Sequence, residues 1–101
     1  MEIEILRDTD RTVMKIRGKI DEKGSEQMKN RFHEEHLYTA PELVFDFADV
    51  DYVGSACIGK LLLFYKKMFD SGGQIRIINA SSVVYELLII VKLDDLFTIN
   101  K

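Results

Sequence analysis

Ser55 is the residue whose type and surroundings best support regulated chemistry. It stands between Gly54 and Ala56, where a strand-like run gives way to a long apolar-periodic segment. We predict that Ser55 is the N-cap of a helix, with its Oγ accepting a hydrogen bond from a backbone N–H of the first turn. The start of a helix also favours negative charge, so it would suit a phosphate esterified to this hydroxyl. Local chemistry alone leaves both an ordinary cap and a phosphorylation switch open.

Cys57 is a second candidate for chemistry, in what would be the first turn of the same helix. Thiol pKa values fall at such positions. A catalytic cysteine also needs a base and an oxyanion pocket, and the two histidines, His33 and His36, lie elsewhere in a polar segment. We interpret Cys57 as a small packed residue and keep a cysteine enzyme as a rival. A single cysteine excludes an internal disulfide and a cysteine-based zinc site.

Two groups of residues invite a metal-binding interpretation. His33 and His36 are three apart, so a helix would place them on one face, but they lack the four-residue His spacing of the zincin motif. Asp46, Asp49 and Asp51 are interpreted as strand-end and turn residues, because alternation along a strand sends neighbours to opposite faces. The expectation is a non-enzymatic protein with no metal and no cofactor.

Composition narrows the function classes. The chain has 101 residues, which predicts one domain over 1–101. Its 14 basic and 17 acidic side chains give a net charge of -3, without the basic stripe typical of nucleic-acid partners. The longest apolar runs, 61–65 and 87–91, are too short to cross a bilayer, and the first residues lack signal-peptide features. We expect a cytoplasmic protein with no nucleic-acid partner and no membrane insertion.

The first third of the chain predicts a hairpin followed by a helix. Residues 2–6 and 11–17 both alternate polar and apolar side chains and are separated by a short Asp/Thr turn, as in an antiparallel hairpin. Asp21 is placed to begin a helix over about 22–36. The expected buried stripe of that helix is narrow and continues beyond it: Met28, Phe32 and Leu37.

The middle of the chain predicts a strand at 43–47 and a helix over about 58–69, which residues 71–73 end with glycine. The apolar residues at helical spacing define the expected core face of this helix: Ile58, Leu61, Leu62, Tyr65, Met68 and Phe69. Leu63 falls on the opposite side with the lysines, which indicates an exposed apolar residue on a charged face.

The last third predicts a strand at 74–78, a helix over about 83–92 capped by Ser81 or Ser82, and a short terminal strand. The expected core side of the helix consists of Val84, Leu87, Leu88 and Val91, with Ile89 roughly opposite. The predicted fold class is α/β: a mixed β-sheet with an N-terminal hairpin, then alternating helices and strands, in which helix-connected strands run parallel.

The run 44–59 resembles the signature of STAS domains, typified by bacterial anti-sigma factor antagonists. That signature reads apolar-Asp-apolar-x-x-apolar-x-apolar-apolar-Asp-Ser-Ser/Ala/Thr-Gly-Leu/Ile-Gly. The resemblance covers essentially the whole chain, because residues 18–21 look like the family's Gly-x-Leu/Ile-Asp turn and residues 87–97 resemble its closing helix and tail. Gly54 and Cys57 depart from the pattern, which usually has Asp and Gly at these positions.

The resemblance implies a partner-switching regulator of transcription. In this family the serine after the motif Asp is phosphorylated by a serine-protein kinase that often is also the anti-sigma factor. The unmodified antagonist binds the kinase, phosphorylation breaks the complex, and a PPM-type phosphatase resets it. By position, Ser55 is the implied phosphorylation site, and Asp21 matches an acidic residue near it.

The expected partner surface is the Ser55 loop and the exposed side of the following helix. Its members are Asp21, Gly54, Ala56, Cys57, Gly59, Lys60 and Leu63. The alternative is a STAS subunit that is not phosphorylated and acts as a scaffold or as an accessory of a transporter or signalling complex. The oligomeric state, the partner and the regulated process stay open.

Overall fold

The computed structural model describes all residues, Met1–Lys101, as one sheet with helices and short 3-10 turns. The elements, in chain order, are β1 (Glu2–Arg7), β2 (Thr12–Ile20), α1 (Glu22–Glu34), η1 (Leu37–Thr39), β3 (Glu42–Val53), α2 (Ser55–Asp70), β4 (Gln74–Ile78), α3 (Ser82–Ile90), η2 (Leu93–Asp95) and β5 (Thr98–Ile99). No helix is both long and apolar enough to span a membrane.

The sheet has five strands in the order β1-β2-β3-β4-β5. Strands β1 and β2 pair antiparallel as the predicted hairpin, with Ile5 opposite Met14. The remaining pairs, β2–β3, β3–β4 and β4–β5, are parallel. The predicted α/β class with a mixed sheet is therefore confirmed.

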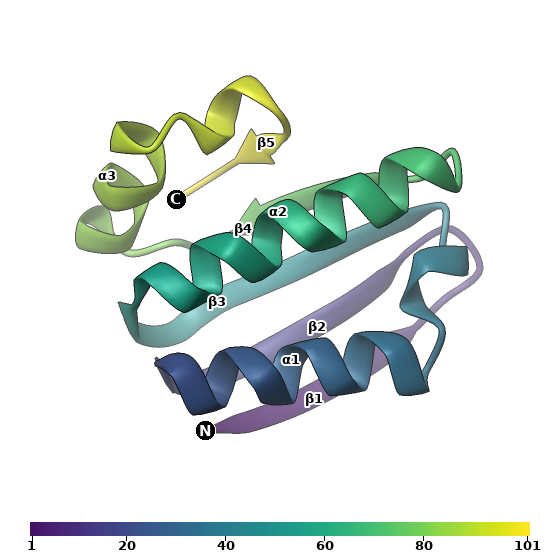
Figure 1. The fold of residues 1–101 in the computed structure, drawn as a ribbon, viewed down its shortest axis with the longest axis horizontal. Helices are drawn as coiled ribbons and strands as arrows, with labels where there is room; N and C mark the ends of the chain where they lie inside the picture. Colours follow the sequence, from purple (N-terminus) through teal and green to yellow (C-terminus); the bar gives the residue numbers. More distant parts are fainter.

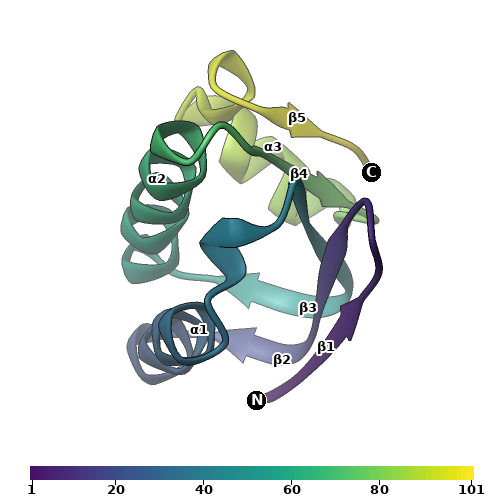
Figure 2. The ribbon, with the colours of Figure 1, turned by 90° about the vertical axis from the view of Figure 1, so that its right-hand side faces the viewer.

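Helices α1 and α2 lie side by side across the sheet and begin at the same edge of it, the left-hand edge in Figure 1. This follows from the parallel pairing, because β2 and β3 both end at that edge and each leads directly into its helix. Turned by 90°, the molecule shows α1 and α2 together on one side and β1, β2 and β3 on the other (Figure 2).

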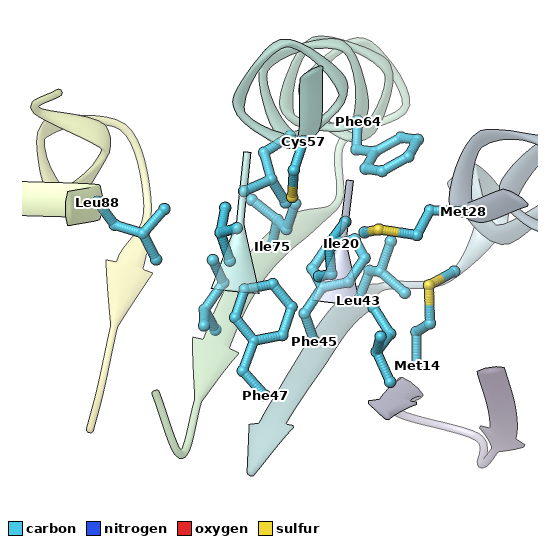
Figure 3. Close-up of a cluster of buried hydrophobic side chains, with 14 of the residues drawn as sticks. Met14, Ile20, Met28, Leu43, Phe45, Phe47, Cys57, Phe64, Ile75 and Leu88 are labelled. Atoms are coloured by element: carbon cyan, nitrogen blue, oxygen red, sulfur yellow. The ribbon is translucent and has the colours of Figure 1, made fainter. Parts of the chain in front are cut away.

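One continuous hydrophobic core fills the space between the sheet and the helices (Figure 3). Phe64 of α2 is at its centre, with its ring stacked on Phe32 of α1 at 4.6 Å and on Phe45 of β3 at 5.7 Å between centroids. The predicted stripe of α1 is confirmed, because Met28, Phe32 and Leu37 are all buried. Burial of large apolar side chains is the main stabilising contribution to such a domain.

Strand β3 extends well beyond the predicted 43–47 and includes all three aspartates assigned to a strand end and turn. Its pairing with β2 shifts register twice, and each shift adds one residue on β3. Bulges of this kind interrupt the alternation of side chains, so the sequence pattern stops resembling a strand after Phe47. The chain nevertheless stays hydrogen-bonded as far as Val53.

Helices α1 and α3 are shorter than predicted. α1 ends at Glu34, and α3 ends at Ile90. His36 and Lys92 follow these helices in the left-handed backbone region, with φ of 51° and 63°. On α3, Val84 and Leu88 are buried as predicted, whereas Leu87 is half-buried and Val91 is 40% exposed.

Candidate functional site

The site is formed where the parallel strands β2 and β3 end and the helices α1 and α2 begin. Ile20 and Val53 are register partners at the ends of β2 and β3. The backbone N–H of Gly54 donates a hydrogen bond of 3.0 Å to the carbonyl oxygen of Ile20. This bond ties the start of α2 to the start of α1. Residues 21 and 55, which are distant in sequence, therefore lie at neighbouring turns on one edge of the sheet.

Ser55 is the first residue of α2, and the predicted N-cap role belongs to Gly54. Gly54 has extended φ and ψ of -91° and 173°, and its carbonyl oxygen accepts hydrogen bonds from the N–H groups of Cys57 and Ile58. The prediction was wrong by one residue because it took the hydroxyl as the cap, whereas the backbone of Gly54 fills that position. The Ser55 side chain is exposed and makes no hydrogen bond to the protein.

Asp21 is the N-cap of α1, as predicted. Its carboxylate accepts a hydrogen bond of 2.8 Å from the N–H of Gly24, and its carbonyl oxygen accepts one of 2.7 Å from the Ser25 hydroxyl. A cap of this kind contributes about 1 kcal/mol to stability. Asp21 is exposed at the same edge as Ser55, so the structure brings these two predicted site residues together.

Lys60 links the two helices instead of projecting freely from α2. Its Nζ lies 3.3 Å from the Glu26 carboxylate of α1, and 25% of its side chain is exposed. An ion pair this close to solvent contributes at most about 1 kcal/mol. Lys60 therefore stands at the rim of the predicted partner surface, on its α1 side.

The face of α2 that packs in the core differs from the predicted one by a rotation about the helix axis. The buried residues of this helix are Cys57, Leu61, Phe64 and Met68. Leu62 and Phe69, both assigned to the core, are 43% and 68% exposed. Leu63, assigned to the exposed side, is half-buried. Because apolar residues occupy consecutive positions from Leu61 to Tyr65, periodicity does not select one face, and the packing against α1 and β3 decides.

The residues of α2 that point away from the core form an outward stripe at helical spacing: Ser55, Gly59, Leu62 and Lys66. All four are exposed, and a Cβ added at Gly59 would have no atom within 4 Å. Gly59 is thus on the predicted surface, and Ala56 is half-buried beside it. The exposed apolar side chain of the stripe is Leu62, where Leu63 was expected.

Cys57 faces the core and is fully buried, so its side chain is not part of the partner surface that the sequence indicated. Burial raises the pKa of the thiol to about 12. Because the thiolate is the nucleophilic form of cysteine, burial disfavours the reactive form of this side chain at neutral pH. The interpretation of Cys57 as a packed residue is confirmed. The thiol that the rival cysteine-enzyme interpretation needs is not accessible to a substrate.

Among the residues that suggested a metal site, the two histidines and Asp46 make hydrogen bonds to other groups of the protein. The Nδ1 of His33 donates to the carbonyl oxygen of Lys29, while His36 lies beyond the end of α1 with its Nδ1 3.2 Å from the Tyr38 hydroxyl. Asp46 accepts hydrogen bonds from the Ala48 N–H and the Asn79 amide. The structure contains no group of three or more His, Cys, Asp or Glu residues arranged to hold a metal ion.

Tyr52 is the member of the site that the sequence did not single out. It is half-exposed at the end of β3, opposite Lys19 of β2. A Cβ built on Gly54 would lie 3.3 Å from the Tyr52 hydroxyl oxygen and 3.4 Å from its ring. The ring therefore covers the residue immediately before Ser55. The residue types of this segment do not indicate such a contact, which depends on how the Tyr52 ring packs.

The fold and the site together define a small α/β domain that presents an unbonded serine at the start of a helix. The family model described as STAS domain matches residues 1–101. The chain belongs to the STAS domain family.

Solved structures share this fold. An anti-sigma factor antagonist from Mycobacterium paratuberculosis matches with a TM-score of 0.86 at 18% identity, covering 98% of this chain and 84% of that one. An anti-sigma-factor antagonist (STAS) domain protein from Planctomyces limnophilus gives 0.83 at 20% identity, over 98% and 89% of the two chains. The Bacillus cell fate determinant SpoIIAA in its phosphorylated form gives 0.76 at 12% identity, over 99% and 91%.

Proposed function

We propose that this chain is a partner-switching regulator of the anti-sigma factor antagonist type. In its unmodified form it binds a serine-protein kinase that acts as an anti-sigma factor or a related regulator, and phosphorylation of Ser55 ends the binding. A PPM-type phosphatase restores the binding form. The observation that carries this proposal is the Ser55 hydroxyl, which is exposed at the first residue of α2 and has no hydrogen-bond partner in the protein.

The position of Ser55 supports both transfer of a phosphate and its effect. An exposed, unbonded hydroxyl is open to a kinase without local unfolding. Phosphorylation adds about -1.5 to -2 charges at the N-terminal end of the outward stripe of α2, in a chain whose net charge is already -3. A partner surface that fits the neutral serine would then meet an unpaired charge, which is costly in a closed interface.

The partner surface that we propose combines the junction with the outward stripe. Asp21 and Gly54 lie on the junction side, Gly59 and Leu62 continue along α2, and Lys60 forms the rim. Leu62, the exposed leucine of the outward stripe, supplies the apolar anchor that interfaces place near their centre. The chain acts here by binding, not by catalysis, and we place it in the cytoplasm.

Calorimetry with a serine-protein kinase of the anti-sigma factor type tests the proposal. The unmodified chain and Ser55→Ala should bind with similar affinity, because alanine keeps the neutral surface. Ser55→Asp and Ser55→Glu should bind at least about tenfold more weakly, a difference of about 1.4 kcal/mol. Equal affinity of all four proteins would show that charge at residue 55 does not control binding.

A scaffold role is the second candidate, and the outer side of α3 favours it. Val83 and Ile90 are 77% and 75% exposed, more than any other large apolar residues of the chain. The two residues are seven positions apart on one side of α3, and contiguous exposed apolar patches on a monomer mark contact surfaces. If the chain is an assembly subunit, light scattering should show oligomers that Ile90→Lys dissociates, and Ser55→Glu should leave them intact.

A further inference from the structure

Tyr52 has a hydroxyl without a hydrogen-bond partner, and this hydroxyl lies beside Gly54, the residue before Ser55. The oxygen is 3.3 Å from the position of a Cβ on Gly54, and the side chain is half-exposed. Gly54 has an extended conformation that any residue adopts, so the space that the Tyr52 ring takes up, not backbone strain, limits what this position holds. The Tyr52 hydroxyl makes no hydrogen bond within the protein.

Two of the other polar side chains at this edge, Asp21 and Lys60, already have partners in the protein. The Asp21 carboxylate is bound to the N–H of Gly24, and Lys60 is paired with Glu26. Lys19, the register partner of Tyr52, is exposed and forms no ion pair. Tyr52 and Lys19 are therefore free side-chain donors at this edge, and Tyr52 is the one that contacts Gly54, the residue before Ser55.

We propose that Tyr52 is a positioning residue of the switch: its hydroxyl donates a hydrogen bond to a phosphate on Ser55 and holds that phosphate against the start of α2. This inference rests on the proposed modification of Ser55. The phosphate offers three strong acceptor oxygens, and hydrogen bonds to an ionised acceptor are short and strong. The same contact orients the phosphate toward the backbone N–H groups of the first turn, which favour anions.

The pKa of the phosphate on Ser55 can be used to detect this contact. A hydrogen bond to the charged form of a group favours that form and lowers its pKa. The second pKa of a phosphoserine is ordinarily about 6. In this chain it should be lower while the Tyr52 hydroxyl is present, and removal of the hydroxyl alone should bring it back up.

The experiment uses the full chain with phosphoserine incorporated at residue 55 during translation, and follows the phosphorus NMR shift with pH. Tyr52→Phe keeps the ring and should raise the phosphate pKa by about 0.5 to 1 unit, the range of one neutral-donor hydrogen bond. Tyr65→Phe is the matched control. It removes a hydroxyl ten residues further along α2, about 15 Å away, and should leave the pKa unchanged. Thermal melts of the three proteins verify that each is folded.

An identical phosphate pKa in the parent and in Tyr52→Phe would overturn the inference. A shift produced by Lys19→Met but not by Tyr52→Phe would also overturn it, because the lysine would then be the group that holds the phosphate. The measurement needs no kinase. Its failure would thus leave the phosphorylation of Ser55 untouched, while failure of a kinase to modify Ser55 would not alter the measured contact.

Discussion

The N–H of Gly54 donates to the carbonyl oxygen of Ile20 at 3.0 Å, and this single bond connects the two strand-to-helix junctions of the site. Through it, the cap of α1 and the first residue of α2 are held at one edge of the sheet. A substitution that destabilises one junction should therefore also destabilise the other.

Asp21 should contribute to stability through its cap. Asp21→Ala removes the acceptor of the Gly24 N–H and should lower the free energy of unfolding by about 1 kcal/mol, which corresponds to a decrease of about 4–8 °C in the melting temperature of a domain of this size. Asp10→Ala, which changes an exposed aspartate with no side-chain bond, is the control. Equal melting temperatures for the two variants would refute the capping role.

The Gly59→Ala variant should affect stability and partner binding in opposite directions. Glycine inside an exposed helix costs about 1 kcal/mol relative to alanine, and a Cβ at residue 59 meets no neighbouring atom within 4 Å. Gly59→Ala should therefore raise the melting temperature. If the partner approaches α2 closely at this point, the added methyl group should also weaken binding. A more stable variant with undiminished affinity would place the interface elsewhere.

Leu62 should matter more to the partner than Leu63. Leu62→Glu places a charge on the outward stripe, where the side chain is 43% exposed. We expect at least about a tenfold loss of affinity for the kinase without loss of fold. Leu6→Glu changes a leucine that is 50% exposed on β1, away from the site, and should bind normally. Equal losses for both variants would indicate a non-specific effect of charge.

Cys57 should make stability fall at alkaline pH. Burial raises the pKa of its thiol from 9.0 to about 12, so between these values the folded state keeps a proton that the unfolded state has lost. Stability from this group is complete below pH 9 and decreases by up to about 1.4 kcal/mol per pH unit above it. Urea unfolding at pH 8 and pH 10 should show the decrease in the parent and a smaller one in Cys57→Ala. Equal decreases would contradict it.

The parts of the molecule that local signals specify could be predicted from the sequence. The hairpin, the caps Asp21 and Ser81, and β4 all depend on residues within a few positions of one another, and the structure has them as expected. The extent of β3 and the orientation of α2 depend on contacts between distant segments. Two bulges interrupt the alternating pattern, so the sequence does not show where β3 ends. The packing of Phe64 against Phe32 determines which face of α2 is buried. The contact of Tyr52 with Gly54 depends on how the ring packs, which residue types alone did not indicate.

The central claim is that Ser55 carries the switch, and intact-mass spectrometry with tandem mapping tests it most directly. The purified chain is incubated with the serine-protein kinase that it binds and ATP, beside Ser55→Ala as the control. We predict one added phosphate, located on Ser55, in the parent and none in the variant. An unmodified parent, or a phosphate that persists in Ser55→Ala, would contradict the account.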